Sequence, residues 1–191
     1  MDYNREKALE LFKQHNKTDS LLKHALTVEA VMRRFARHYG EDEARYGVIG
    51  LLHDLDYEKF PTEHCQHTGE MMREAGYDDA DIHAVLSHGW SLVNDVEPIS
   101  AMEKTLFTID ELSGIITAVV YVRPSHSVLD LEVKSVKKKF KDKAFAANCN
   151  REVIQKGADM MGMPLDEVMQ MTIEGMREAA EALGLAGDLS N

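Results

Sequence analysis

The sequence has few of the features that mark extracellular or membrane-spanning proteins. It contains two cysteines, Cys65 and Cys149, which form no CxxC pair and provide no disulfide framework. We therefore expect both to be free thiols in a reducing compartment. The most apolar stretch, Ile115 to Val122, is about eight residues long, whereas roughly 20 are needed to cross a bilayer. No apolar segment follows the charged residues 1–7, so no secretory signal is expected.

Basic residues are also in the minority. The chain has 22 Lys and Arg against 33 Asp and Glu, and its formal net charge is −11 at pH 7. Such a surface repels nucleic-acid phosphates, so we expect no nucleic-acid polymer as a partner. A local basic pocket for one phosphate group is compatible with this charge. Together with the short apolar runs, the charge predicts a soluble, cytoplasmic protein without a membrane partner.

Helical periodicity is abundant, and strand alternation is scarce. In the clearest case apolar residues recur at steps of four and three: Leu21, Ala25, Val28, Met32, Phe35 and Tyr39. We expect helices over residues 5–15, 18–39, 41–55, 68–75, 78–87, 100–122, 151–161 and 165–183. The chain has 191 residues and no repeat or linker, so it fits one domain. The predicted fold class is all-α, a compact bundle with a core at about 18–122 and a C-terminal helical extension at about 125–191.

A group of histidine and aspartate residues indicates a metal site. His53 and Asp54 follow an apolar run, so they lie at the end of a buried helix, where a carboxylate is costly unless it is paired or coordinated. His24 lies on the flank of an apolar helical stripe, and Asp110 lies inside the most apolar helix. Each residue alone could be a hydrogen-bonded polar group of the core. Their combination favours a site for Zn, Mn or Fe, which imidazole and carboxylate ligands suit.

The order His24, then His53-Asp54, then Asp110 resembles the H…HD…D signature of the HD-domain metal-dependent hydrolases. The segment from Gly50 to Asp56 is also similar to the central segment of that family. The resemblance covers about residues 18–122. It implies an HD-domain helical bundle and a metal-dependent phosphohydrolase.

The resemblance further implies a second metal ion. Dinuclear members of the family have two extra histidines between the HD pair and the last aspartate, and His64 and His88 occupy matching positions. Asp54 would then bridge the two ions. Cys65 stands where many members have a proline, and His67 and His83 compete with the two assigned histidines. The branch most similar in its six ligands hydrolyses dinucleoside polyphosphates, but we leave the substrate open.

The implied chemistry is attack on a phosphoryl group by a metal-activated water. The cofactor would be one or, more in keeping with six ligands, two divalent ions: Fe or Mn, with Zn, Co or Mg as alternatives. Asp54 would take part directly, and the nearby Asp56 and Glu58 could supply a base. Candidate phosphate contacts are Lys59, Lys104 and Arg123. The basic run Lys134 to Lys143 is either a solvated face or a flank that attracts an anionic substrate.

Three classes of function remain after this reading. The first is a phosphohydrolase whose partner is a small phosphorylated substrate, such as a nucleotide or a related ester. The second is a di-iron oxygenase of HD fold, because the same ligands serve both chemistries. The third is a non-catalytic HD domain that binds a ligand or takes part in signalling. The methionine-rich segment Met160 to Met176 suits core packing or a homodimer interface.

Overall fold

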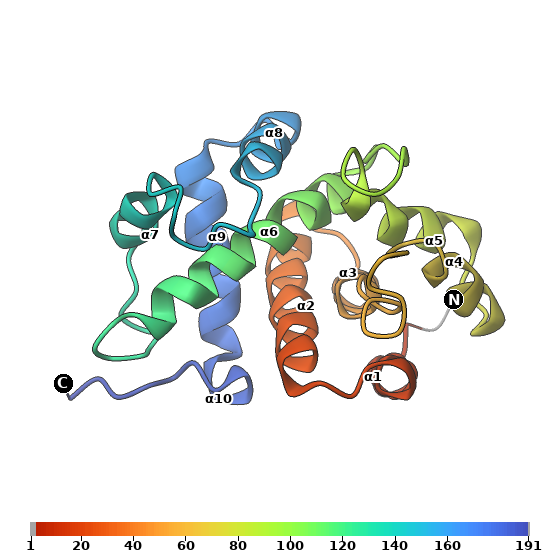
Figure 1. Ribbon diagram of the computed structural model, residues 1–191, viewed down its shortest axis with the longest axis horizontal. Coiled ribbons are helices and arrows are strands. Elements are labelled where there is room, and N and C mark those ends of the chain that lie inside the picture. The colour runs from red at the N-terminus through yellow and green to blue at the C-terminus, as the bar shows by residue number, and fades with distance from the viewer. Residues whose placement is uncertain (1–2, 191) are drawn as a thin grey trace.

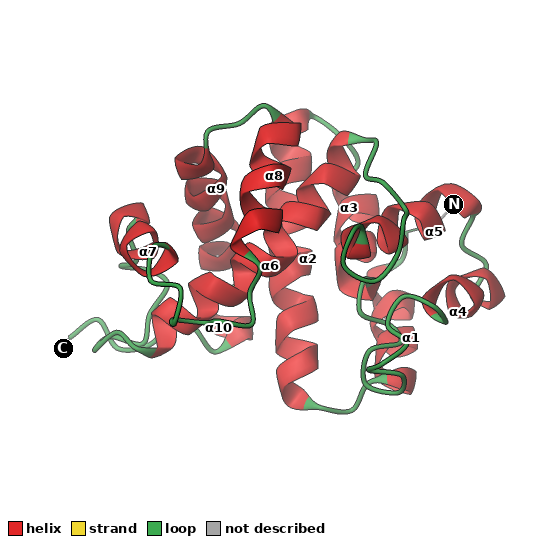
Figure 2. Cartoon of the chain, turned by 45° about the horizontal axis from the view of Figure 1, so that its top comes forward, coloured by secondary structure: helices red, strands yellow, loops and turns green. Residues whose placement is uncertain are grey.

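Two helices of 21 residues, α2 (Asp19–Tyr39) and α6 (Ala101–Tyr121), form the centre of the molecule. The computed structural model describes residues 3–190. Within that range every regular element is helical (Figure 2), apart from one isolated bridge between Trp90 and Asn94. The predicted all-α class is therefore confirmed.

The other helices lie on two sides of this central pair (Figure 1). One side holds α1 (Arg5–His15), α3 (Glu43–Leu52), α4 (Thr68–Glu74), α5 (Asp79–Leu86) and the 3₁₀ turn η1 (Ser87–Gly89). The other side holds α7 (Val133–Phe140), α8 (Arg151–Met161), α9 (Leu165–Glu178) and α10 (Ala180–Leu183). Packing of α3 and α9 against α2, and of α8 against α6, joins the two sides into one core.

Glycines allow the helices around the central pair to approach closely. A Cβ at Gly50 of α3 would lie 2.9 Å from the Met32 Cγ of α2 and 3.2 Å from the Val28 carbonyl oxygen. A Cβ at Gly157 of α8 would lie 1.9 Å from the Thr108 Oγ1 of α6. Larger residues would push these pairs of helices apart, and interiors packed at this density do not tolerate such a shift without cost.

The central helices have well-defined ends. The α6 helix begins with a capping box, in which the Ser100 hydroxyl accepts from the Glu103 amide and the Glu103 carboxylate accepts from the Ser100 amide. The α2 helix ends at Gly40, whose φ of 69° is in the left-handed region that favours glycine. These ends fix where the ligand-bearing turns of both helices lie.

The segment from residue 140 to 150, between α7 and α8, is held by one arginine. The Arg151 guanidinium donates to backbone carbonyls of Phe140, Asp142, Phe145, Ala146 and Cys149. The Asn150 amide donates to the Glu111 carboxylate of α6 at 2.8 Å. These contacts fix the segment against α6.

Several predicted helix limits needed correction. The third helix spans Glu43–Leu52 rather than 41–55, because the Asp42 side chain caps its start and the chain turns after Leu52. The last predicted helix, 165–183, is interrupted at Ala179. The helix α7, in the lysine-rich run, was not predicted. None of the helices in residues 3–190 combines the length and apolar character needed to cross a membrane.

Candidate metal centre

The six predicted metal ligands lie together between the two sides of the bundle. They come from α2, the end of α3, the loop before α4, η1 and the middle of α6: His24, His53, Asp54, His64, His88 and Asp110. Five separate parts of the chain therefore meet at one place.

The first group of ligands contains His24, His53 and Asp110. The His24 Nε2 lies 2.9 Å from the Asp110 Oδ1 and 3.2 Å from the His53 Nε2. The His53 Nε2 lies 3.4 Å from the same Asp110 oxygen. Two nitrogens and one carboxylate oxygen thus face a common point.

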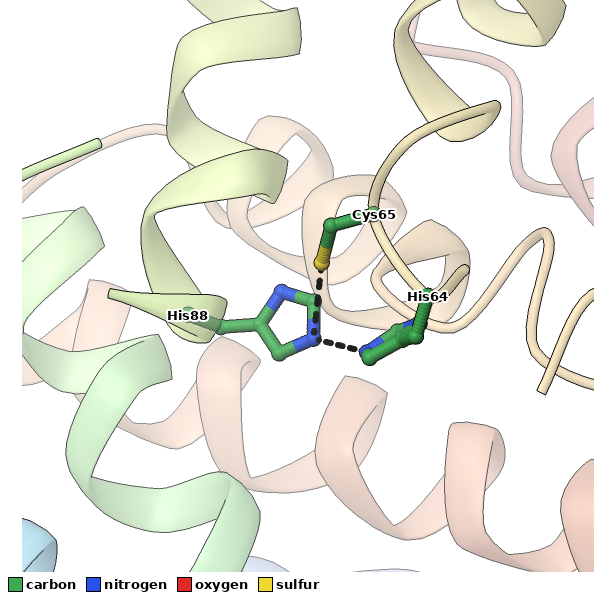
Figure 3. Close-up of side chains that lie close together, drawn as sticks. All are labelled: His64, Cys65 and His88. Carbon is green, nitrogen blue, oxygen red and sulfur yellow. Dashed lines mark hydrogen bonds between the residues drawn. The ribbon is translucent and has the colours of Figure 1, made fainter. Parts of the chain in front are cut away.

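The second group contains His64 and His88, whose Nε2 atoms lie 3.0 Å apart (Figure 3). The Cys65 Sγ lies 3.9 Å from the His88 Nε2 and points toward the same space. Burial raises the pKa of the Cys65 thiol, and the nearby Asp56 and Asp54 carboxylates raise it further. Cys65 is therefore a neutral thiol beside the two imidazoles.

Asp54 lies between the groups and presents one oxygen to each. Its Oδ2 lies 3.3 Å from the His53 Nε2 and 3.7 Å from the His24 Nε2. Its Oδ1 lies 3.4 Å from the His64 Nε2 and 3.7 Å from the His88 Nε2. The carboxylate is thus oriented as a bridge between two ligand sets.

Hydrogen bonds at the outer ring nitrogens turn the histidines toward this space. The Nδ1 of His53 lies 2.7 Å from the Gly50 carbonyl oxygen, and the Nδ1 of His88 lies 2.6 Å from the Val85 carbonyl oxygen. Because a carbonyl oxygen can only accept, both Nδ1 atoms carry hydrogen. In the neutral ring the Nε2 lone pair then faces the ligand cluster, an arrangement common among ligating histidines.

Asp56 does the same for His64. Its Oδ1 lies 2.9 Å from the His64 Nδ1, and its oxygens also accept from the Cys65, His67 and Thr68 amides. Burial alone would raise the pKa of Asp56, but the hydrogen bonds from His64 and these amides outweigh it and lower the pKa. Asp56 is fully buried, and its contacts hold His64 and the loop in place. Its predicted role as a base stays a prediction.

The charges of His53, Asp54, Asp110 and His88 depend on one another. Burial favours a neutral His53, but the carboxylates of Asp54 and Asp110 outweigh it and raise the pKa of His53 well above its usual value. The same attraction overcomes burial at both carboxyls and lowers their pKa. Burial, together with the charge at His53, lowers the pKa of His88 to about 4. His88 is therefore neutral near pH 7.

The arrangement fits divalent metal ions. Two ligands that each lie about 2.1 Å from one ion, at ordinary bond angles, are about 3.0 to 3.4 Å apart. The contacts of the first group, at 2.9, 3.2 and 3.4 Å, and the 3.0 Å contact between His64 and His88 match that spacing. Imidazole and carboxylate also suit Fe, Mn and Zn.

A hollow of about 310 Å³ opens over these ligands. Tyr57, Leu92 and Val93 form an apolar rim, and Glu111 and Cys149 line its wall. Burial raises the pKa of Glu111, and the neighbouring Asp110 carboxylate raises it further. None of these wall and rim residues was predicted from the sequence. The sequence signal that could have indicated them is position next to a predicted ligand: Glu111, for example, directly follows Asp110.

The competing histidines point elsewhere. His67 pairs with Glu63 at 2.6 Å and stacks on Phe60, and His83 pairs with Glu103 at 2.9 Å. Neither lines the hollow.

The remaining predicted site residues lie away from the hollow as well. The Glu58 carboxylate accepts from the Lys17 and Thr18 amides just before α2, and these hydrogen bonds lower its pKa. Lys59 is exposed and extends over the Phe60 ring. Neither side chain lines the hollow.

The other two predicted phosphate contacts, Lys104 in α6 and Arg123 just after its end, lie away from the hollow too. Lys104 lies about 9 Å along the helix axis from Asp110 and does not line the hollow. Arg123 lies beyond the end of α6 at Tyr121 and pairs with Asp130 at 2.6 Å. Proximity in sequence to a ligand did not place either charge at the site.

Comparison with protein families agrees with this geometry. Residues 21–115 match the family model of the HD domain, and this range contains all six predicted ligands. The chain is an HD-domain protein. No curated protein and no solved structure matched it in the corresponding searches. The HD-domain match ends within α6, so α7 to α10 lie outside it.

Proposed function

We propose that this HD-domain protein is a metal-dependent phosphohydrolase that acts on a small phosphate ester through a metal-activated water. The observation that supports this most directly is the orientation of Asp54, with one oxygen toward His24 and His53 and the other toward His64 and His88. A carboxylate shared in this way would hold two ions close together, as in two-metal hydrolytic sites. The HD superfamily consists mostly of metal-dependent phosphohydrolases, which agrees with the proposal.

The chain would hold the ions through the four imidazoles, Asp54 and Asp110. Divalent ions at such a site lower the pKa of bound water and neutralise charge on a phosphoryl oxygen. Glu111 lines the hollow and has a raised pKa, so it is placed to donate a proton to the departing oxygen. The apolar rim of Tyr57, Leu92 and Val93 would limit the access of bulk water.

The test is phosphate release from p-nitrophenyl phosphate and adenosine 5′-monophosphate, with Mn²⁺ or, under anaerobic conditions, Fe²⁺. Asp54→Asn should remove metal binding and activity together. Asp79→Asn is the matched control, because the Asp79 side chain is 91% exposed and pairs only with Arg73. Metal binding without hydrolysis of either ester would contradict the proposal. Oxygen uptake by the iron-loaded protein without phosphate release would instead favour an oxygenase.

A further inference from the structure

A second hollow, of about 320 Å³, adjoins the hollow over the ligands. It lies between the start of α2, the second half of α6 and the segment Leu183 to Leu185. His24 and Gly114 line both hollows, so the two are parts of one groove that begins at the ligands. We call the second hollow the α2–α6 groove.

The α6 helix forms a continuous wall from the ligands into this groove. Asp110, Gly114, Thr117 and Tyr121 follow one another at steps of four, three and four, which places them on one helix face. Tyr121 therefore lies about 16 Å along the axis from Asp110. Its side chain is 52% exposed and makes no ring contact or hydrogen bond within residues 3–190. A planar group could stack there without displacing a partner.

Gly114 keeps the two hollows connected. A Cβ at this position would lie 3.0 Å from the Cys149 Sγ on the opposite wall. A larger side chain would therefore occupy the junction between the hollows, so the absence of a side chain leaves a path from the ligands to Tyr121.

The charges along the path differ between its two ends. Among residues 3–190, the first hollow is lined by the carboxylates of Asp54, Asp110 and Glu111 and by no lysine or arginine. In the same part of the chain, the second hollow has Lys23 as its single lysine or arginine and Asp19 as its single carboxylate. Within residues 3–190, Lys23 has no ion-pair partner, although Asp19 lies only one turn away. It is therefore free to meet an anionic group of a ligand.

We propose that the α2–α6 groove binds the leaving group of the substrate, and that this leaving group carries an aromatic ring and an additional anionic group. This rests on the proposed phosphohydrolase function. Water would add to the phosphorus at the ligands and lose a proton. The bond from phosphorus to the leaving oxygen would break with its electron pair on that oxygen, which would take up a proton, so that the products are phosphate and the free leaving group. Lys23 would contact the anionic group, and Tyr121 would stack on the ring.

The first test measures binding of adenosine 5′-monophosphate, a ring with an attached anion, by calorimetry. The protein is the full chain with chelator present, so that metal ions cannot contribute. Tyr121→Ala should weaken binding about fivefold or more, since stacking on a ring is lost. Lys23→Gln should weaken it about threefold at low salt and reduce its salt dependence. Lys7→Gln, an exposed lysine of α1, is the control and should bind as the wild type does.

The second test compares hydrolysis of adenosine 5′-diphosphate with that of p-nitrophenyl phosphate, whose short leaving group cannot reach Tyr121. In Lys23→Gln and Tyr121→Ala, the KM should rise more for adenosine 5′-diphosphate than for p-nitrophenyl phosphate. Equal binding of the monophosphate by wild type, Lys23→Gln and Tyr121→Ala would overturn the groove assignment even if the short ester is hydrolysed. The protein could instead hydrolyse neither adenosine 5′-diphosphate nor p-nitrophenyl phosphate, while both variants lose binding of the monophosphate. That result would support the groove assignment and refute the proposed hydrolase function.

Discussion

The Oδ1 of Asp56 lies 2.9 Å from the Nδ1 of His64, and this contact turns the Nε2 of His64 toward His88. Asp56 also accepts three backbone amides, so it orders the loop that carries the imidazole. The residue that does most to orient His64 is thus not itself placed to touch an ion.

Asp56→Asn should weaken metal binding about 10- to 100-fold, the usual loss when the outer partner of a ligating histidine is removed. The new amide group would also face backbone N–H donors, which should destabilise the fold by about 1 to 3 kcal/mol. Calorimetric metal titration and urea unfolding measure the two effects. Unchanged metal affinity in a folded variant would show that His64 needs no such partner, and Asp79→Asn serves as the control.

The two ligand groups predict different stoichiometries for different variants. Wild-type protein purified without chelator should contain about two divalent ions per chain, the number that a bridged site holds. His88→Ala should retain about one, because the group of His24, His53 and Asp110 is intact, whereas Asp54→Ala should retain none. Elemental analysis gives the ratios. Two ions in His88→Ala would place the second ion elsewhere.

Glu111→Gln should affect poor leaving groups more than good ones. If Glu111 protonates the departing oxygen, its loss should slow hydrolysis of adenosine 5′-monophosphate about 100-fold, since general acids typically contribute at least that much. p-Nitrophenolate departs readily without a proton, so the rate with its ester should fall much less. The glutamine can still accept the Asn150 amide. Equal losses for both esters would exclude the role, and Glu97→Gln, an exposed change, is the control.

The capping glutamate of α6 gives a pH-dependent prediction. Burial alone would raise the pKa of Glu103, but hydrogen bonds from the Ser100 and Ile99 amides and from His83 outweigh it and lower the pKa. A lowered folded-state pKa means that the stabilisation is present above the unfolded value of about 4.3 and is lost as the pH falls through the folded value.

Glu103→Gln should therefore destabilise the protein by about 1 kcal/mol at pH 7 and progressively less in more acidic solution. Urea unfolding of both proteins at several pH values checks this. A destabilisation that is the same at pH 3 and pH 7 would mean that the charge of Glu103 contributes nothing.

The sequence predicts the local parts of this structure well. Apolar periodicity located the central helices, and His53-Asp54 and Asp110 were apparent as candidate ligands because polar groups within apolar runs need a partner. The candidates His64 and His88 came from the resemblance to the HD family instead. The choice between His64 and His67 depends on Asp56 and on the course of the loop, which periodicity does not describe. The short helix α7 was missed because it has eight residues and four of them are lysines, which are equally typical of a solvated loop.

Distance in sequence was a poor guide to which charges face the ligands. Lys59 lies only five residues after Asp54 but points away, and Arg123 follows the helix of Asp110 but pairs with Asp130. Lys23, directly beside a ligand on α2, lines the α2–α6 groove instead. The position of Lys23 in the groove depends on how α2 and α6 cross, which the sequence does not show.

The wall that carries Cys149 is supplied by a segment outside the HD-domain match, and Arg151 holds that segment through five carbonyl groups. The predicted metal ligands all lie within the HD-domain match, whereas one wall of the space above them comes from outside it. Changes confined to the C-terminal half could alter which molecules are accepted while every ligand stays the same. Evolution and engineering thus have a route to new selectivity that leaves the metal chemistry untouched.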